Sequence, residues 1–246
     1  MRLHLAAVTT YLNYKNDLPI HTYTLETYLA LKNKIDLNWI ENDYFILDSG
    51  AYTFMRGNKG DIDWNKYIEE YAGFILNNNI KFYFELDIDK IIGLKEVEKL
   101  TDKLYQLTNI KPIPVWHIDR GLEYYDYMIN NYPYIALSAA GNNFSSEWTR
   151  TKEGYSFIDK LVNKALIKKV KVHALGFTHL EQLNKIKFYS CDSTGWLFGS
   201  KFGKLFTYKN GKIIHTRPTD KRIKQKEARI NNFEEWKKLQ DYYLTK

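Results

Sequence analysis

Short apolar runs alternate with longer amphipathic segments along most of this chain. Runs of roughly four to eight residues that are rich in β-branched and aromatic side chains are typical of buried strands. The strands predicted in this way are Leu3–Thr9, Tyr44–Leu47, Lys81–Asp87, Ile113–Ile118, Tyr134–Leu137, Val170–Leu175, Phe188–Cys191 and Lys204–Tyr208. Apolar residues at helical spacing predict helices at 61–78, 93–109, 151–166 and, with Thr178 as N-cap, at 178–185.

This alternation favours an α/β fold with a parallel sheet. About eight strands separated by helices predict a single (β/α)₈ barrel over residues 1–246, with irregularity allowed at the eighth strand. A doubly wound open sheet is the alternative, but no G-x-G-x-x-G loop follows the first strand. Within the same domain, Asn210-Gly211 predicts a hairpin over 204–215, and 231–244 predicts a C-terminal helix.

Composition adds a bias toward a polyanionic partner. The chain has 246 residues, of which 44% are hydrophobic and 26% charged, and it has no apolar run of ~18 residues that would cross a membrane. Its formal net charge of +7 favours a nucleic acid, although the basic stretch Lys209–Arg229 is equally well explained as a solvated surface. The single cysteine, Cys191, excludes an intramolecular disulfide and a multi-cysteine zinc site, so we expect a cytoplasmic protein.

Acids, histidines and glycines recur where the predicted strands end. In a parallel barrel these ends converge on the active site. They carry, in chain order, Asp48-Ser49-Gly50, Glu85, Asp87, Asp89, His117, Asp119, Arg120, Ser138, Gly141, His173, Gly176 and Asp192. Asp89 and Asp119 are better explained as capping or turn residues. Asp48 and Asp192 each follow an apolar run and precede a turn of small residues, so they are the strongest candidates for chemistry.

Two carboxylates in one cleft suit chemistry at an anomeric carbon, where one acts as nucleophile and the other transfers protons. The small residues after the fifth strand would let a flat ring approach the backbone, and Tyr52 and Trp196 would stack on it. No H-x-H or H-E-x-x-H spacing indicates a metal site, and the G-x-S-x-G elbow of a serine hydrolase is missing. We therefore expect neither a metal nor a cofactor.

The motifs at these strand ends resemble those of the tRNA-guanine transglycosylases, enzymes of (β/α)₈ fold that exchange a guanine in nucleic acid for a 7-deazaguanine base. "LDSGAYTF" resembles the family's D-S-G-G-F/Y motif, and "FYFELD" and "PVWHIDRG" fall where it has its F-D-E and V-Q-G-G segments. "LSAAGNN", "HALGF" and "FYSCDSTGW" follow in the order of its L-A-V-G-E, M-G-V-G and F-D-C motifs. The resemblance spans roughly residues 44–203.

This resemblance implies roles for the matching residues. Asp192 would attack C1′, and Asp48 would contact the purine and act as general acid and base. Glu85 or Asp87 would accept the N1/N2 donors of guanine, with the register between the two left open. The predicted substrate-binding set also contains Ser49, Gly50, Tyr52, His117, Ser138, Ala139, Gly141, His173, Gly176 and Trp196. The residues expected on the nucleic-acid rim of the cleft are Arg120, Arg150, Lys201, Arg217, Lys221 and Arg222.

Two departures from the family narrow the prediction. Its zinc subdomain needs three cysteines and a histidine, which this chain cannot supply, and His117 stands where the family has its recognition glutamine. The chain is therefore similar to the compact phage relatives that place 7-deazaguanines into DNA, so DNA is preferred over tRNA as partner, with the host cytoplasm as location. Two other functions stay open: a glycosidase or nucleoside hydrolase that uses the same acids, and a non-catalytic barrel that binds a nucleotide or a protein.

Overall fold

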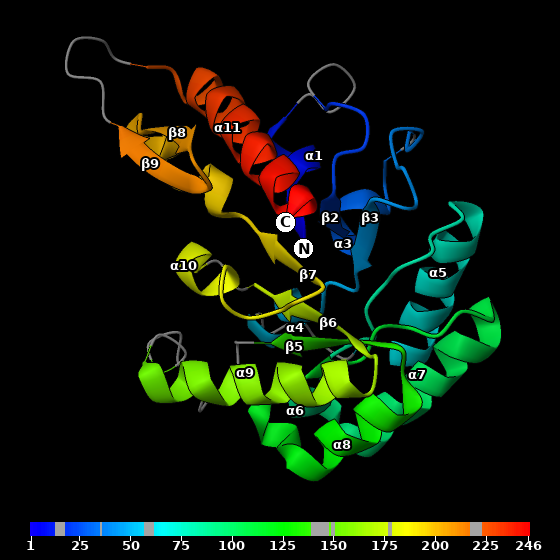
Figure 1. The fold of residues 1–246 in the computed structure, drawn as a ribbon. Coiled ribbons are helices and arrows are strands. Elements are labelled where there is room, and N and C mark those ends of the chain that lie inside the picture. The colour runs from blue at the N-terminus through cyan, green and yellow to red at the C-terminus, as the bar shows by residue number, and fades with distance from the viewer. Residues whose placement is uncertain are drawn as a thin grey trace.

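The described part of the chain contains a curled sheet of seven parallel strands with helices outside it, and a separate two-stranded hairpin (Figure 1). The computed structural model describes residues 1–12, 18–34, 36–56, 62–138, 148, 151–176, 179–216 and 223–246. The strands of the sheet are β1 (Arg2–Ala6), β2 (Thr24–Thr27), β3 (Phe45–Asp48), β4 (Val115–Trp116), β5 (Tyr134–Ser138), β6 (Lys171–Leu175) and β7 (Ser190–Ser193). Their order, β3-β2-β1-β7-β6-β5-β4, gives a half-barrel of a TIM-like α/β fold.

The two outer strands, β3 and β4, are linked by the segment 82–85. Tyr83 forms an isolated parallel bridge with Leu47, and Phe84 forms one with Ile113. The backbone N–H of Phe84 donates to Leu47 O at 3.0 Å, and that of Glu85 donates to Ile113 O at 3.1 Å. Two bridges are too few for a regular strand. The prediction of a closed eight-stranded barrel is therefore wrong, while its α/β class and its curled parallel sheet are confirmed.

Six of the eight predicted strands form part of this sheet, with shifted ends. The predicted strand Lys81–Asp87 supplies only the two bridges just described. The predicted strand Lys204–Tyr208 lies in the hairpin instead, as β8 (Leu205–Lys209) paired with β9 (Lys212–Thr216). The sheet also contains β2, a strand of sequence T-L-E-T between β1 and β3 that the apolar-run criterion did not detect.

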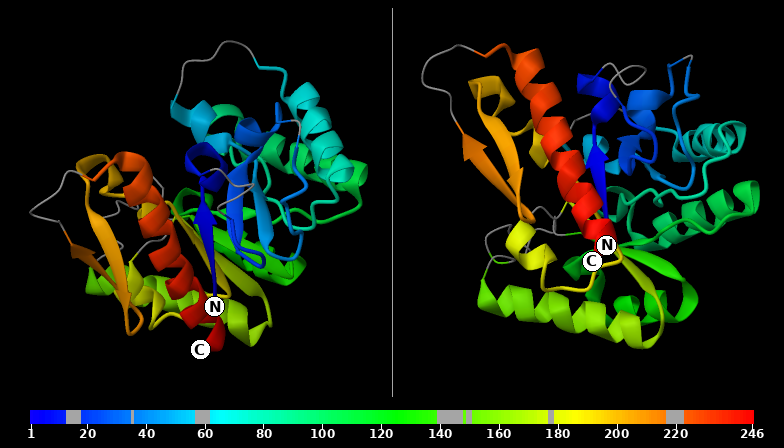
Figure 2. Two further views of the ribbon diagram at one scale, coloured as in Figure 1. Left: turned by 90° about the horizontal axis from the view of Figure 1, so that it is seen from above. Right: turned by 45° about the horizontal axis from the view of Figure 1, so that its top comes forward.

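The long helices cover the outer face of the sheet (Figure 2). The predicted helices 61–78, 93–109 and 151–166 are confirmed as α5 (Trp64–Asn77), α7 (Leu94–Thr108) and α9 (Lys152–Ile167). The segment 178–185 forms the short α10 (Leu180–Leu183), and its expected cap Thr178 lies outside the described residues. The other helices are α1 (Val8–Tyr11), α3 (Tyr28–Leu31), α4 (Ala51–Arg56), α6 (Asp89–Ile92), α8 (Gly121–Asn131), and the 3₁₀ turns η1 (Ile118–Arg120), η3 (Gly195–Leu197) and η4 (Ser200–Phe202).

The two faces of the sheet have different chemistry because side chains alternate along each strand. The outer face is apolar and packs on the helices, for example through Leu3 and Val172. The concave face carries a smaller apolar cluster that includes Ala6 and Ala136. The strand registers pair Ala136 with His173, His173 with Ser190, and His4 with Asp192. His4, His173, Ser190 and Asp192 therefore lie on the concave face, together with Ala6 and Ala136.

The C-terminal helix packs against β1 on one side and against the hairpin on the other (Figure 2). Asn210 and Gly211 have φ values of 49° and 78°, which confirms the predicted type I′ turn. The predicted C-terminal helix is confirmed as α11 (Gln225–Thr245), and it holds the termini together through a hydrogen bond of 2.8 Å from the Met1 amino group to Tyr243 O. Among the described helices, none combines the length and the apolar character that crossing a bilayer requires.

Candidate active site

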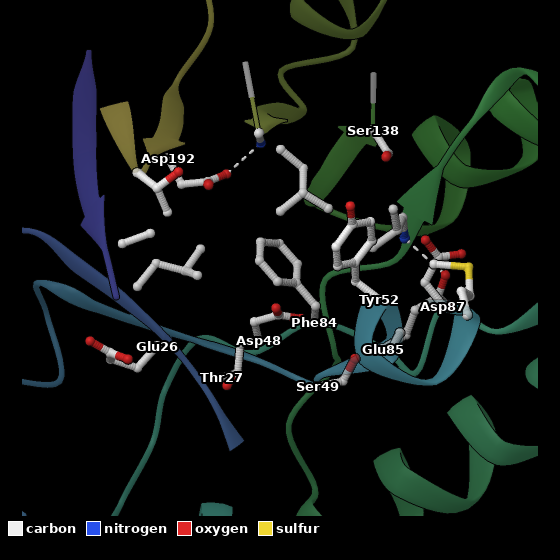
Figure 3. A pocket seen from close by; sticks show the side chains of 18 of the residues that line it. Glu26, Thr27, Asp48, Ser49, Tyr52, Phe84, Glu85, Asp87, Ser138 and Asp192 are labelled. Atoms are coloured by element: carbon white, nitrogen blue, oxygen red, sulfur yellow. Dashed lines mark hydrogen bonds between the residues drawn. The ribbon is translucent and has the colours of Figure 1, made fainter. Parts of the chain in front are cut away.

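The carboxyl ends of the parallel strands surround a cavity of about 370 Å³ (Figure 3). Every strand of the sheet contributes at least one lining residue, and α4 adds the half-exposed Tyr52. Much of the wall is apolar, with Phe84 at its centre in Figure 3. The acids that line it are Glu26, Asp48, Glu85, Asp87 and Asp192. An apolar pocket of this size with a few convergent polar groups is typical of a small-molecule or base-binding site.

Asp48 is the last residue of β3 and lies partly buried in the cavity wall. The backbone N–H of Gly50 donates to its Oδ1 at 3.2 Å. Gly50 has a φ of 83°, and a Cβ there would come within 2.9 Å of Leu29, so the turn that supplies this donor requires glycine. Burial raises the pKa of Asp48 to about 6, and the negative charge of Asp192 contributes to the rise. Asp48 can thus hold and release a proton near neutral pH.

Asp192 lies within β7, one residue before its end, and only 7% of its surface is exposed. Its Oδ1 accepts hydrogen bonds from the backbone N–H of Gly176 at 2.7 Å and from His173 Nε2 at 3.2 Å. Gly176 has a φ of 67°, a conformation that favours glycine. Among the described residues both hydrogen bonds go to the same oxygen. Oδ2 is therefore the oxygen that remains for a ligand in the cavity.

A buried ion-pair network lies across the cavity from Asp192 (Figure 3). The fully buried guanidinium of Arg120 binds Glu85 at 2.6 Å and Asp87 at 3.0 Å. Glu85 also accepts hydrogen bonds from the Val115 N–H at 2.9 Å and from the Thr101 hydroxyl at 3.1 Å, so protein donors surround it. Burial raises the pKa of Asp87 to about 7 against the opposing charge of Arg120. Asp87 is the acid of this pair that is more available to a ligand.

His117 and Asp89 belong to the same network. His117 Nε2 lies 3.0 Å from Asp89 Oδ1 and 3.7 Å from Asp87 Oδ1. Burial opposes ionisation of Asp89, but the hydrogen bond from His117 and the charge of Arg120 together hold its pKa below the usual range. Asp87, Asp89 and His117 each offer one possible metal-ligand atom, and these atoms lie within 4.8 Å of one another. A cation bound there would compete with Arg120, which already pairs with both carboxylates.

The structure brings together most of the predicted site residues. Those that line the cavity are Asp48, Ser49, Tyr52, Glu85, Asp87, His117, Ser138, Gly176 and Asp192. Gly50 and His173 act from outside the cavity lining, as hydrogen-bond donors to the two candidate catalytic acids. The predicted residues that lie outside the described part of the chain are Ala139, Gly141, Arg150, Arg217, Lys221 and Arg222, and the side chain of Lys201.

Two site predictions are wrong. Arg120 is predicted on an exposed rim, but its side chain is fully buried because three carboxylates surround it. Trp196 is predicted to stack on a ligand, but it is 0% exposed. Its Nε1 donates to Ala6 O at 2.9 Å, and its ring packs edge-on against Phe233 of α11. Trp196 therefore belongs to the hydrophobic core between the sheet and the C-terminal helix.

The cavity also contains features that the sequence analysis missed. Glu26 of β2 is buried, and its Oε1 accepts a hydrogen bond from the Thr9 N–H at 2.7 Å. Burial raises the pKa of Glu26 to about 7. The alternation of apolar and polar residues in Y-T-L-E-T-Y-L was the signal that could have found β2. Ser49 was predicted as a binding residue, and the structure adds that its buried Oγ has no hydrogen-bond partner among the described residues, which a polar ligand could satisfy.

Comparisons of the chain with protein-family models and with curated protein sequences found no match.

Proposed function

We propose that this chain is a base-exchanging transglycosylase that replaces a guanine in nucleic acid by a 7-deazaguanine base. The observation that carries the proposal is that Asp48 and Asp192 line one cavity and lie close enough for their charges to interact. Base exchange through a covalent intermediate needs such a pair, because one carboxylate must attack C1′ while the other transfers protons. The preference for DNA over tRNA rests on the resemblance to the compact phage enzymes.

The first half of the reaction removes guanine. Asp192 forms a bond to C1′ while the bond between C1′ and guanine N9 breaks, and the electron pair of that bond leaves with the base. Asp48, protonated at a pH near its pKa of about 6, donates its proton to the departing guanine. The hydrogen bonds to Asp192 Oδ1 from Gly176 and His173 hold the nucleophile in place during the attack.

The second half restores the enzyme. The Asp48 carboxylate takes the N9 proton of the incoming 7-deazaguanine, whose N9 then attacks C1′. The ester bond to Asp192 breaks, and both acids return to their starting protonation states. Because one proton is given and one is taken, the exchange needs no cofactor and no external acid. Water in place of the second base would give hydrolysis by the same two residues.

Asp87 is the residue that we assign to the guanine edge. Glu85 already accepts hydrogen bonds from three protein donors, whereas Asp87 accepts one from the described residues, from Arg120. An ionised carboxylate can accept both the N1–H and the N2–H of guanine, and adenine lacks this donor pair. Asp87 lies across the cavity from Asp192 (Figure 3). A bound guanine nucleotide can therefore place its N1/N2 edge at Asp87 and its C1′ at Asp192.

The cavity is enclosed by strand ends, so a base within a duplex would have to leave its stack to reach it. Tyr52 is half-exposed and lines the cavity, so we assign its ring to stacking on the extruded base. Unstacking costs a few kcal/mol, and a stacking contact of this kind offsets on the order of 1–3 kcal/mol.

The test is exchange of labelled guanine into DNA and tRNA, together with denaturing-gel trapping of a covalent adduct. The wild type should incorporate label and form the adduct. Asp192→Asn should do neither, because an amide is a poor nucleophile. Asp48→Asn should bind the nucleic acid and lose ~10²–10⁴ in exchange rate. Asp102→Asn, an exposed acid on α7, is the matched control and should behave as wild type.

Each failure has a distinct meaning. An adduct that persists in Asp192→Asn removes this residue from the nucleophile role. Abasic product without incorporation of label would identify a hydrolase. A wild type that gives neither product nor adduct with DNA or tRNA would refute the proposed function.

A further inference from the structure

A row of four buried polar side chains ends at Asp192. The Tyr134 hydroxyl on β5 hydrogen-bonds Ser190 Oγ on β7, and Ser190 Oγ lies 2.6 Å from His173 Nδ1 on β6. His173 Nε2 lies 3.2 Å from Asp192 Oδ1. His173 and Ser190 are both 0% exposed. The proposed chemistry gives no direct role to Tyr134 or Ser190, yet burying such groups is costly unless their hydrogen bonds are made.

The hydrogen-bonding capacity of each group gives this row a direction. The proposed function requires an ionised Asp192 as nucleophile; an ionised carboxylate only accepts, so in that state the His173 Nε2–H donates to Asp192. In a neutral imidazole Nδ1 is then an acceptor, and the Ser190 hydroxyl must donate to it. The Ser190 oxygen in turn accepts from the Tyr134 hydroxyl. Every proton in the row has one position, and all of them point toward the Asp192 carboxylate.

The strands that carry these residues fix the geometry. His173 and Ser190 are register partners on neighbouring strands, and Asp192 follows Ser190 by two residues on the same face of β7. The His173 ring contacts the ring of Phe84, at a centroid distance of 5.2 Å, and that of His4, at 5.9 Å. Rotation of the imidazole would therefore disturb both contacts.

We infer that Tyr134, Ser190 and His173 form a positioning relay for Asp192. The relay holds His173 in its Nε2–H tautomer, keeps Asp192 Oδ1 occupied, and aims Oδ2 at C1′. This role rests on the proposed function of Asp192 as nucleophile. His173 touches neither base nor sugar in this scheme, so it is a positioning residue and not a catalytic one.

Loss of the relay should change how the reaction depends on pH. The ionisable groups around Asp192 are His173 from β6, His4 from β1, Asp48 from β3 and the neighbouring Cys191 of β7. A hydrogen bond to the ionised carboxylate stabilises it, so its removal makes Asp192 harder to ionise. In a plot of the rate of adduct formation against pH, the acidic limb should therefore move to higher pH. The basic limb, which Asp48 sets, should stay in place.

The experiment compares His173→Phe with His173→Gln in single-turnover adduct formation. Phenylalanine keeps the volume and removes the donor, whereas the glutamine amide can reach the position of Nε2. His173→Phe should slow adduct formation about 10- to 100-fold and raise the acidic midpoint by about one pH unit. His173→Gln should stay close to wild type in both measures. Ser190→Ala should shift the midpoint in the same direction by less, because the tautomer is then no longer fixed. His21→Gln, at an exposed histidine that pairs with Glu41 outside the cavity lining, is the matched control and should leave the midpoint unchanged.

The outcomes separate this inference from the proposed function. If the wild type forms the adduct but the midpoint of His173→Phe does not move, or if His173→Gln is as slow as His173→Phe, the relay is refuted and the function stands. If the wild type forms no adduct, the function fails. The relay is then decided by the ¹³C titration of the Asp192 carboxyl, which should ionise at higher pH in His173→Phe than in wild type. Identical titrations in the two proteins would overturn it.

Discussion

Replacing Glu26 by glutamine should stabilise the protein above neutral pH and leave its stability nearly unchanged in acid. Glu26 is buried with 2% of its surface exposed, and its Oε1 accepts a hydrogen bond from the Thr9 N–H. Glutamine keeps the shape and the accepting oxygen, so the substitution mainly removes the ability to ionise. The difference between the two proteins therefore reports the cost of a buried charge at the edge of the cavity.

The magnitude follows from proton linkage. Burial raises the pKa of Glu26 from 4.5 to about 7 in the folded protein. Between these two values the folded state binds more protons than the unfolded state, so stability falls as pH rises through this window. Each factor of ten in proton affinity is worth about 1.4 kcal/mol, so the loss in wild type amounts to about 3 kcal/mol. Glu26→Gln should lack this loss, because its side chain does not titrate.

Urea unfolding followed by tryptophan fluorescence at pH 4.5, 6, 7 and 8 measures the effect. The free energy of unfolding of Glu26→Gln should exceed that of wild type by about 3 kcal/mol at pH 8 and by little at pH 4.5. Other groups that titrate in this range, such as Asp48, are present in both proteins and cancel in the difference. Glu70→Gln, an exposed acid on α5, is the matched control and should show no pH-dependent difference. A difference for Glu26→Gln that is constant across this range would show that Glu26 is not desolvated, and the reasoning from its burial would be wrong.

Two further substitutions test the buried polar contacts that support the site. Arg120→Met should destabilise the fold by about 3–5 kcal/mol, because it leaves a buried carboxylate such as Glu85 without its partner. A loss below about 1 kcal/mol in urea unfolding would show that water replaces the guanidinium. Gln240→Leu should cost at least about 2 kcal/mol, because the Gln240 amide donates to Leu3 O and Tyr23 O and thereby ties α11 to the sheet. Hydrogen exchange of α11 that is as slow in the variant as in wild type would contradict this.

Several features of the fold were determined by local sequence alone. The stripe of apolar residues in 61–78 specified α5, because a helix of that spacing buries one continuous face. Asn210-Gly211 specified the hairpin, since both residues tolerate the positive φ that a type I′ turn needs. The sequence also allowed Asp48 and Asp192 to be proposed as partners. Both follow predicted strands, and in a parallel sheet the strand ends meet at one edge.

The tertiary structure decided what the local pattern could not. The four residues of β2 form a strand only because β1 and β3 supply partners on both sides, and this burial gives Glu26 its unusual environment. The sequence analysis placed Arg120 on the surface, because its neighbours along the chain give no sign that Glu85 and Asp87 enclose it. Lys204–Tyr208 had the composition of a sheet strand, yet β7 pairs directly with β1 and leaves no place for it there.

The row of hydrogen bonds behind Asp192 is the clearest example of a feature that only the tertiary structure decided. Tyr134, Ser190 and His173 belong to three strands separated by long stretches of chain, and each has an ordinary local sequence. Their contact depends on the register of β5 with β6 and of β6 with β7. The sequence alone determined which residue types stand at the strand ends. Strands and helices have side-chain periods of two and of 3.6 residues, and these periods locate the ends of the elements along the chain. Which of them touch was decided by the strand registers and the curl of the sheet, which bring distant residues into one buried space.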